Sequence, residues 1–534
     1  MKFFARLTGQ FFFRIMCLSL FSFLLSATVQ AQDNSAKLDR RLASVDAAIS
    51  QGKFQANWQS LGRYQAPEWF RDAKFGIFIH WGVYAVPAFG NEWYSRNMYL
   101  RGSDAFAHHL SVYGPQSTFG YKDFIPLFTA LKFDPDAWVD LFKKAGARYI
   151  VPVAEHCDGF PMYASDFTEW NAAKMGPKRD IVGELARAAR KQGLHFGASS
   201  HRAEHWWWYG VGATFDSDVR DPKNAGLYGP AQSTNPPWDH SGNYPDPNHL
   251  EQWLPPDSNF LDDWLARSTE IVDKYHPDIF YFDWWINQPQ FQPYLKRLAA
   301  YYYDRAAQRN TGVVLTYKIQ AFPENAAVLD IERGKLDALR LLPWQTDTSV
   351  SVKSWGYIEN DSYRTARSLI AELVDVVSKN GDLLLDVGPT AEGTIPHEVQ
   401  DILLAMGAWL KTNGDAIYAT RPWSVYGEGP TAVITGKSKG NESEAFTSQD
   451  IRFTTKDGIL YAIALGWPDD RRLVIHTLWA GTPYLPKPVT RVELLGSPQA
   501  LTWKQTEEGL VLQLPSAKPN DIAYAFKIVS GSKK

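Results

Sequence analysis

Ionisable and aromatic side chains follow short apolar runs along much of this chain. The clearest run, Phe75–His80, ends by placing His80 and Trp81 before a Gly- and Pro-containing loop that carries Glu92 and Trp93. A short run of β-branched and aromatic residues of this kind predicts a buried strand. A histidine, a carboxylate and large aromatic rings beyond the end of a strand are groups that can bind a polar ligand or transfer a proton.

The same construction recurs down the chain. Seven further apolar runs end in polar or charged residues: Tyr149–Ala154, Leu194–Ala198, Asp278–Phe282, Val313–Tyr317, Ala327–Ile331, Trp344–Ser349 and Asp382–Gly388. Amphipathic stretches of helical period lie between them: Asp136–Ala145, Arg179–Gly193, Phe260–Tyr275, Tyr294–Gln308 and Ser362–Asn380. About eight strand–helix units predict a (β/α)8-like barrel, in which the carboxyl ends of the strands build the active site. An open doubly wound sheet is the alternative, but no Gly-rich phosphate loop follows any of these strands.

The chain is long enough for two domains, since it has 534 residues, 45% of them hydrophobic. The helical period stops after Asp415, and short alternating segments separated by turns follow. Seven strands are expected: Ala432–Thr435, Ile451–Thr455, Ile459–Leu465, Arg472–Thr477, Val489–Leu494, Leu510–Leu514 and Ile522–Ile528. This pattern predicts an all-β sandwich. We therefore expect a catalytic barrel at 32–418 and a C-terminal β-sandwich at 419–534.

Residues 1–31 have the features of a secretory signal peptide. A basic start with Lys2, Arg6 and Arg14 precedes the apolar stretch Ile15–Ala27 and a small-x-small site ending at Ala31. The apolar stretch is too short to span a membrane, and Gln32 stands where a lipid anchor would need a cysteine. These features predict export to the periplasm or the exterior, with no membrane anchor. Cleavage would remove three basic and no acidic residues, which moves the formal net charge from −3 to −6 and argues against a nucleic-acid partner. Oligomeric state does not follow from the sequence.

Carboxylates and aromatic rings are the prominent groups at the predicted strand ends. Histidines are present, but none lies in an HExxH pattern, and there is no Gly-x-Ser-x-Gly motif, so we expect no metal, no cofactor and no serine nucleophile. The candidate carboxyl groups are Glu92, Glu155, Asp158, Glu204, Asp283, Glu332 and Asp347. Aromatic faces stack on pyranose rings and carboxylates hydrogen-bond their hydroxyls, while glycoside hydrolysis needs two carboxyl groups. A carbohydrate-active site is therefore expected.

The chain resembles the α-L-fucosidases of glycoside hydrolase family 29. The matching motifs, in order, are Lys74–Gly82 (KFGIFIHWG), Asn91–Tyr94 (NEWY), Glu155–Phe160 (EHCDGF), Gly176–Asp180 (GPKRD), Pro277–Trp285 (PDIFYFDWW), Trp355–Tyr357 (WGY) and Asn380–Gly393 (NGDLLLDVGPTAEG). The resemblance implies a retaining hydrolase of fucosylated oligosaccharides or polysaccharides. It also implies an Asp nucleophile at the end of the fourth barrel strand, which is Asp283 here.

The general acid/base has two candidates. The family places this residue some tens of positions beyond the nucleophile without a firm local motif. Glu332 follows the sixth predicted strand, whereas Glu324 lies on a predicted loop. Because strand-end placement is favoured in a barrel, we expect Glu332 to be the acid/base and Glu324 to be the alternative.

The resemblance also predicts the residues that bind the sugar. The family's contacts carry over to His80, Glu92, Trp93 and His156, and we add Trp285 beside the nucleophile. Cys157 stands where the family often has a second histidine, and the usual Tyr-rich end of the third strand is replaced by Ser199–Trp206. His201 and Glu204 either take over these contacts or only line the rim.

These departures leave the sugar open. L-Galactose differs from L-fucose by one hydroxyl, and a site without a partner for that hydroxyl rejects it only weakly. A hydrolase of a related α-L-glycoside such as an α-L-galactoside is therefore one alternative. A catalytically silent carbohydrate-binding protein is the other, although the intact Asp283 and an available strand-end Glu argue against it.

Overall fold

The computed structural model describes residues 35–232, 254–433, 436–437 and 446–531. Eight parallel strands close into a barrel in the order β1-β2-β3-β4-β5-β6-β8-β9. Their bounds are β1 Phe75–Ile79, β2 Tyr149–Glu155, β3 His195–Ser200, β4 Ile279–Phe282, β5 Val314–Tyr317, β6 Val328–Asp330, β8 Trp344–Ser349 and β9 Gly381–Val387. Each of the eight apolar runs forms one of these strands, so the predicted barrel is confirmed.

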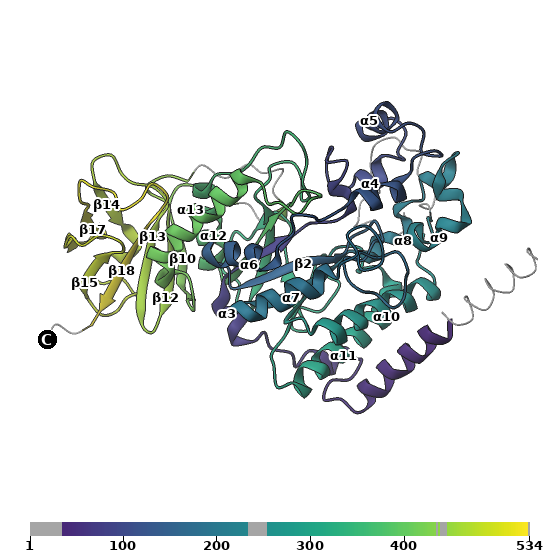
Figure 1. Cartoon of the computed structure of the whole chain (residues 1–534). Coiled ribbons are helices and arrows are strands. Elements are labelled where there is room, and N and C mark those ends of the chain that lie inside the picture. The colour runs from purple at the N-terminus through teal and green to yellow at the C-terminus, as the bar shows by residue number, and fades with distance from the viewer. Residues whose placement is uncertain (1–34, 233–253, 434–435, 438–445, 532–534) are drawn as a thin grey trace, which may run out of the picture.

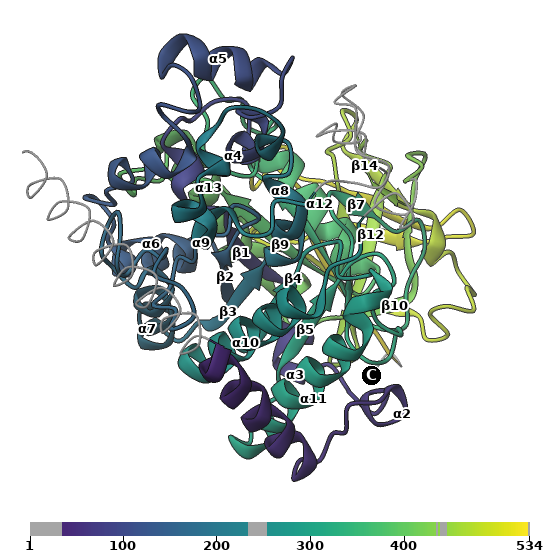
Figure 2. The ribbon, with the colours of Figure 1, turned by 90° about the vertical axis from the view of Figure 1, so that its right-hand side faces the viewer.

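Long amphipathic helices surround the barrel strands (Figure 2). They are α6 Pro135–Lys144, α7 Ile181–Gln192, α10 Ser258–Tyr275, α11 Gln292–Gln308, α12 Ala366–Ser378 and α13 His397–Asn413. Side-chain caps begin several of them: Asp134 accepts a hydrogen bond from an amide of α6, Asp180 from α7, Asp257 from α10 and Thr365 from α12. Such caps satisfy amide groups that have no partner within the helix, which explains why these helices begin where they do.

No amphipathic stretch was predicted between Val313–Tyr317 and Trp344–Ser349, and the structure has no helix in this part of the barrel. Residues 318–327, with Pro323 among them, connect β5 to β6, and residues 331–343 connect β6 to β8. Neither connection contains a helix; the second holds only the two-residue strand β7 (Gly334–Lys335). These segments are short and lack an apolar period, so they have no face to bury against the barrel. They hold Lys318 and Glu332 close to the strand ends.

Shorter helices precede β1 and lie in the connections that follow β1, β3 and β4. Helix 35–50 precedes α2 Trp58–Leu61 and α3 Glu68–Ala73. Between β1 and β2 lie η1 Val83–Ala85, α4 Tyr94–Asn97, α5 Asp104–Val112 and η2 Tyr121–Leu127. Between β3 and α10 lie η3 Arg202–Glu204, α8 His205–Trp208, η4 Gly212–Thr214, η5 Asp218–Arg220, η6 Pro222–Asn224 and α9 Ala225–Tyr228, and η8 Pro289–Phe291 precedes α11.

The C-terminal domain consists of two antiparallel sheets that enclose their own core. One sheet has the order β10-β12-β13-β18-β15 and the other β14-β17-β16. Their bounds are β10 Arg421–Glu428, β12 Ile451–Lys456, β13 Ile459–Ala464, β14 Arg472–Ile475, β15 Val489–Leu494, β16 Thr502–Gln505, β17 Leu510–Gln513 and β18 Tyr524–Ser530. Phe453, Leu473, Leu512 and Phe526 are among the side chains buried between them, which confirms the β-sandwich.

One predicted C-terminal strand, Ala432–Thr435, is not formed in its described part, and two observed strands were not predicted. Residues 432–433 form no strand, and 434–435 lie outside the described residues. Strands β10 and β16 were not predicted, because they are half-exposed and rich in polar residues, and β10 also contains Pro422 and a shift in register. A weak apolar alternation of this kind is typical of edge strands.

The C-terminal domain, yellow in Figure 1, lies against the side of the barrel that carries α12. At this contact Asp375 of α12 accepts hydrogen bonds from Arg452 Nε of β12 at 2.6 Å and from Lys379 Nζ at 2.7 Å, and all three side chains are buried. This ionic cluster fixes the two domains to each other. No helix among the described residues is long and apolar enough to cross a membrane; residues 1–31, the predicted signal peptide, lie outside the described part of the chain.

Candidate active site

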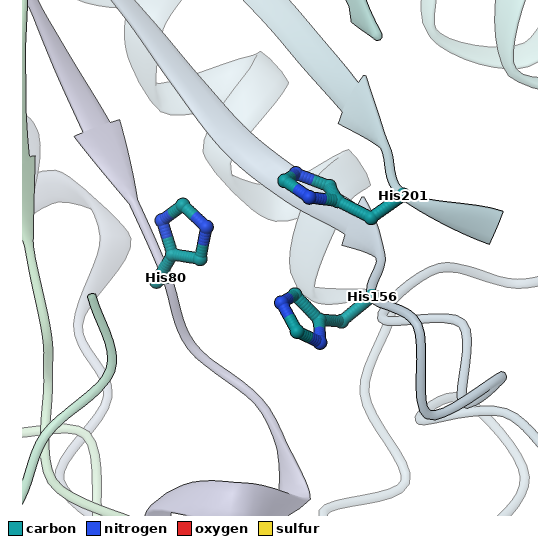
Figure 3. Close-up of side chains that lie close together, drawn as sticks. All are labelled: His80, His156 and His201. Carbon is teal, nitrogen blue, oxygen red and sulfur yellow. The ribbon is translucent and has the colours of Figure 1, made fainter. Parts of the chain in front are cut away.

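Five successive barrel strands each end immediately before an ionisable residue. His80 follows β1, His156 follows β2, which ends in Glu155, His201 follows β3, Asp283 follows β4 and Lys318 follows β5. Parallel strands of a barrel end at the same face, so equivalent positions converge there. Figure 3 shows His80, His156 and His201 reaching toward one another from three neighbouring strands.

These side chains line one pocket at the carboxyl face of the barrel. The pocket is bounded by His80, Glu92, Trp93, His156, His201, Tyr281, Asp283, Trp284, Lys318, Glu332, Asp347 and Trp355. The structure thus brings together seven of the nine residues predicted for the site, including both predicted catalytic carboxyl groups. Glu204 and Trp285 are the two that do not line it.

Asp283 is held by donors on both of its carboxyl oxygens. His201 Nδ1 donates to Oδ2 at 2.9 Å, the Trp284 amide donates to Oδ1 at 2.8 Å, and Lys318 Nζ lies 3.1 Å from Oδ1. Burial alone would raise the pKa of Asp283, but the Lys318 ammonium and the His201 contact outweigh it and hold the pKa well below its usual range. Asp283 is therefore ionised at neutral pH, and its side chain is 16% exposed, so it can reach a ligand.

Lys318 joins three carboxyl groups. Its Nζ lies 3.1 Å from Asp283, 3.3 Å from Glu332 and 3.2 Å from Asp347, and its side chain is 6% exposed. Burial favours the neutral amine, but the three carboxyl groups, Asp283 foremost, raise the pKa of Lys318 well above its usual value. A permanent cation therefore lies between the two predicted catalytic residues.

The three histidines of the pocket are neutral. Burial lowers the pKa of His80 to about 4 and lowers that of His156 and His201 as well. Because the ionised Asp283 can only accept, His201 carries its proton on Nδ1, and Nε2 is left to accept from Ser199 Oγ at 3.1 Å. His80 Nδ1 contacts Asp386 Oδ1 at 2.7 Å, and so His80 Nε2 is the nitrogen that can meet a ligand.

The histidine trio also has the spacing of a possible metal-ligand set. One nitrogen of each ring lies within 4.8 Å of the others. Zinc binds imidazole nitrogens at about 2.0–2.1 Å. Both nitrogens of His201 already hydrogen-bond to protein groups, so binding an ion would break one of these bonds. The neutral rings equally suit sugar hydroxyls, which both donate and accept.

Glu92 and Trp93 form the wall of the pocket opposite the strand ends. Glu92 Oε2 accepts hydrogen bonds from Ser354 Oγ at 3.1 Å and from the Trp355 amide at 3.0 Å. The Trp93 ring packs edge-on against Trp208 with centroids 4.7 Å apart. These contacts fix a carboxylate and an indole ring beside each other, which is the combination that binds a sugar through one hydroxyl and one apolar face.

The predicted substrate contacts of Glu204 and Trp285 are not supported by the structure. Both side chains are completely buried behind the pocket wall, so neither presents a surface to a ligand. Burial and the nearby Asp283 charge raise the pKa of Glu204 well above its usual range, and its neighbour is the Cys157 thiol. Trp284, one position earlier, lines the pocket in place of Trp285. The chain turns at Trp285, whose φ is +74°, and this turn sends the two indole rings in different directions.

The two candidates for the acid/base differ sharply in position. Glu332 lines the pocket and contacts Lys318. Glu324 is 75% exposed and pairs with Arg340 at 3.4 Å. Glu324 therefore lies outside the pocket, while Glu332 lies beside Asp283.

Sequence reasoning assigned no role to Lys318, Tyr281, Trp284 or Trp355. Lys318 had a usable signal, because a lysine directly after an apolar run is as unusual as the histidines and Asp283 at the other strand ends. Tyr281 reads as an ordinary strand residue, and only the closed barrel shows that it faces inward. Trp355 lies six residues beyond the end of β8, and the loop that carries it is placed by the hydrogen bonds that Glu92 accepts from Ser354 Oγ and the Trp355 amide.

A closed barrel whose strand ends gather carboxyl groups, neutral histidines and tryptophans is typical of a glycoside hydrolase. Comparison with known proteins is more specific. The α-L-fucosidase family model matches residues 41–415, and the α-L-fucosidase C-terminal domain model matches 444–529. Tissue α-L-fucosidase of Rattus norvegicus is 32% identical over 87% of this chain and 89% of its own, and plasma α-L-fucosidase of Homo sapiens is 31% identical over 88% and 90%.

Solved structures agree. The crystal structure of Thermotoga maritima α-fucosidase aligns with a TM-score of 0.69 and 30% identity, covering 89% of this chain and 100% of that one. The same protein in complex with fucose aligns with a TM-score of 0.68, at 30% identity and the same coverage. The chain belongs to the α-L-fucosidase family, glycoside hydrolase family 29, and is accordingly a retaining glycoside hydrolase.

The position of Lys318 predicts a shift in pH dependence. In Lys318→Met the pKa of Asp283 should rise, because the cation that stabilises its ionised form is lost. If Asp283 is the nucleophile, activity requires its ionised form, so the acid limb of the kcat/KM profile should move to higher pH by about one to three units. Lys318→Arg, which keeps the charge, should move it much less, and exposed Lys132→Met should not move it. An unchanged acid limb in Lys318→Met would show that Lys318 does not act on the nucleophile.

Proposed function

We propose that this protein is an exported α-L-fucosidase that releases terminal α-L-fucosyl residues from glycans with retention, using Asp283 as nucleophile and Glu332 as general acid/base. The observation that carries this proposal is the contact of one ammonium, Lys318 Nζ, with both Asp283 and Glu332. Two carboxyl groups that share one ammonium lie close to each other, as the nucleophile and the acid/base of a retaining enzyme must.

The first chemical step forms a glycosyl ester. Asp283 attacks the anomeric carbon with an oxygen lone pair as the glycosidic bond breaks, and Glu332 gives its proton to the departing oxygen. The hydrogen bonds from His201 and Trp284 keep Asp283 ionised and oriented before attack. Asp283 loses its negative charge when it forms the ester, and Glu332 becomes negatively charged when it gives up its proton. Lys318 is therefore next to one negatively charged carboxylate of this pair in both states.

The second step releases the sugar. Glu332, now ionised, removes a proton from water as the water attacks the anomeric carbon, and the ester bond to Asp283 breaks. Both catalytic groups then regain their starting protonation states. The two displacements on opposite faces of the sugar give net retention.

The fucose ring would be held by His80, Glu92, Trp93 and His156, which all line the pocket. His80 offers Nε2 alone, because its Nδ1 contacts Asp386, while the neutral imidazole of His156 can donate and accept. Glu92 accepts from a hydroxyl, and the Trp93 face covers the apolar side of the ring. His201 contributes by orienting Asp283 and not by a free nitrogen. This pattern of contacts favours a monosaccharide unit as the ligand, and the fucose complex of the Thermotoga maritima relative supports fucose in that role.

The activity is tested with matched aryl glycosides. We expect hydrolysis of an aryl α-L-fucoside, with kcat/KM for the aryl α-L-galactoside lower by about ten- to a few hundredfold, the range that one extra hydroxyl gives in an unmatched pocket. Proton NMR during the reaction should show the α-anomer of the free sugar forming first. Preference for the galactoside, or first formation of the β-anomer, would overturn the proposal, and binding of fucose without any turnover would favour the silent carbohydrate-binding alternative.

Export and domain division form the second half of the proposal. We infer that residues 1–31 are removed as a signal peptide, that 32–418 form the catalytic unit and that 419–534 form the accessory sandwich. Sequencing of exported protein should give an N-terminus near Gln32. An exported protein that begins at Met1 would contradict the cleavage, and full retention in the cytoplasm would contradict the export.

A further inference from the structure

Two buried carboxyl groups lie directly beneath the catalytic pair. Asp330 ends β6 and is 2% exposed, while Asp347 lies in β8 and is 0% exposed. Strands β6 and β8 are neighbours in the barrel, with Asp330 opposite Gln345. Asp347 is two residues beyond Gln345, so it faces the same side of the sheet one layer nearer the pocket. The two carboxyl groups are therefore buried neighbours on the same side of the sheet, on adjacent strands.

Two neighbouring buried carboxyl groups repel each other when both are ionised, whereas a proton on one of them lets it donate to the other, because an ionised carboxylate only accepts. The remaining contacts account for one oxygen of each residue. Asp347 Oδ2 accepts from Tyr281 OH at 2.9 Å and lies 3.2 Å from Lys318 Nζ, and Asp330 Oδ2 accepts from Gln345 Nε2 at 2.6 Å. The other oxygen of each, Oδ1, is buried and receives no nitrogen or hydroxyl donor from the described residues.

The contacts decide which residue holds the proton. Asp347 lies against an ammonium and a phenol, which stabilise a negative charge. Asp330 has only a neutral amide as its further partner. Burial raises the pKa of Asp330 well above its usual range, whereas the Lys318 charge offsets burial at Asp347 and leaves its pKa below the usual range.

We propose that Asp330 and Asp347 share one proton, carried by Asp330, and that the Asp347 carboxylate is a positioning residue that holds Lys318 between Asp283 and Glu332. The proposal rests on the roles assigned to Asp283 and Glu332 for its effect on catalysis, but the shared proton itself does not depend on them. Asp347 anchors the ammonium from below, so that the cation reaches both catalytic carboxyl groups. The proton on Asp330 removes the repulsion that two adjacent buried anions would cause.

Charged and titratable groups reach this pair from several strands. Tyr281 of β4 and Lys318 after β5 contact Asp347, Asp283 and Glu332 lie above it, and His80 of the pocket and Tyr149 of β2 interact with the pair through space. A loss of charge at 347 therefore acts on the catalytic carboxyl groups, whereas a neutral exchange at 330 does not. The proposal therefore predicts that asparagine at 330 leaves catalysis almost unchanged and that asparagine at 347 impairs it.

The test compares asparagine at the two positions. In Asp330→Asn the new amide can donate to Asp347 as the proposed proton does, so kcat and both limbs of the kcat/KM–pH profile should stay within about twofold and a few tenths of a pH unit of wild type. In Asp347→Asn the Lys318 anchor is lost, so kcat should fall about ten- to a hundredfold. Its alkaline limb should also move to lower pH, because one negative charge near the catalytic acid is gone.

A spectroscopic measurement keeps the proposal testable if activity is lost for other reasons. The infrared difference spectrum of wild type minus Asp330→Asn at neutral pH should show the loss of one carbonyl band of a protonated carboxyl group, distinct from that of buried Glu204, and Asp283→Asn should keep this band. The proposal is overturned if Asp347→Asn is tolerated while Asp330→Asn is not, since the proton would then be on Asp347. It is also overturned if Asp330→Asn moves the alkaline limb as far as Asp347→Asn does, since Asp330 would then be ionised.

Discussion

Replacing Asp283 by alanine should lower kcat/KM for an aryl α-L-fucoside by several orders of magnitude. The substitution removes the carboxylate that forms the covalent bond, and no other carboxyl group in the pocket is held ionised by His201 and a backbone amide. Added azide should restore part of the turnover by entering the space left by the carboxylate. The product should be a fucosyl azide of inverted configuration, because only one displacement then takes place.

A matched control lies at the other end of the same strand. Asp278 immediately precedes β4, at the end of the strand opposite to Asp283, and it pairs with His195 at 3.1 Å. Asp278→Asn should keep activity within about threefold of wild type, since surface pairs contribute little. Ordinary activity in a correctly folded Asp283→Ala protein would remove Asp283 from the mechanism.

Replacing Glu332 by alanine should give a loss that depends on the leaving group. For fucosides with poor leaving groups, kcat/KM should fall about 10²–10⁴-fold, because these need protonation to depart. For aryl fucosides with good leaving groups, kcat/KM should change little while kcat falls, since deglycosylation loses its base. Azide should then accelerate turnover and give a fucosyl azide of retained configuration, because the ester on Asp283 still forms.

Glu324→Ala provides the comparison for Glu332→Ala. Glu324 is largely exposed and pairs with Arg340, so its removal should have little effect on any substrate. The assignment would be reversed if Glu324→Ala showed the leaving-group dependence and azide rescue while Glu332→Ala showed neither. That outcome would require the loop before β6 to fold over the pocket when substrate binds.

Most of the barrel was predictable because its strands are buried on both sides and therefore read as apolar runs, although β8 (WQTDTS) is mostly polar. Phe75–Ile79 and Gly381–Val387 are fully buried, and each of the eight runs was found in the sequence. Strands β10 and β16 were missed because their residues are half-exposed, which leaves no strong alternation. The connections after β5 and β6 show no amphipathic stretch in the sequence, and the structure has no helix there.

Site residues that directly follow a barrel strand could be predicted from the sequence. Residues whose place in the pocket depends on the direction of the side chain were harder to predict. His80, His156, His201 and Asp283 each follow a strand directly, and all four line the pocket. Trp284 and Trp285 are adjacent, and the local backbone, not the residue type, decides which one reaches the ligand. Lys318 was overlooked because one cation joining three carboxyl groups is a property of three separate strands and loops, none of which shows it alone.

Trapping of the covalent intermediate tests the central claim most directly. In a 2-deoxy-2-fluoro-α-L-fucosyl fluoride, the fluorine at C2 destabilises the transition states of both steps. The fluoride leaving group speeds only the first step, so the ester should form faster than it hydrolyses and should accumulate. Mass spectrometry of the intact protein should show the added fluorosugar, and peptide mapping should place it on Asp283. A label on Glu332, Asp347 or another residue, or turnover of ordinary substrates with no label at all, would contradict the account.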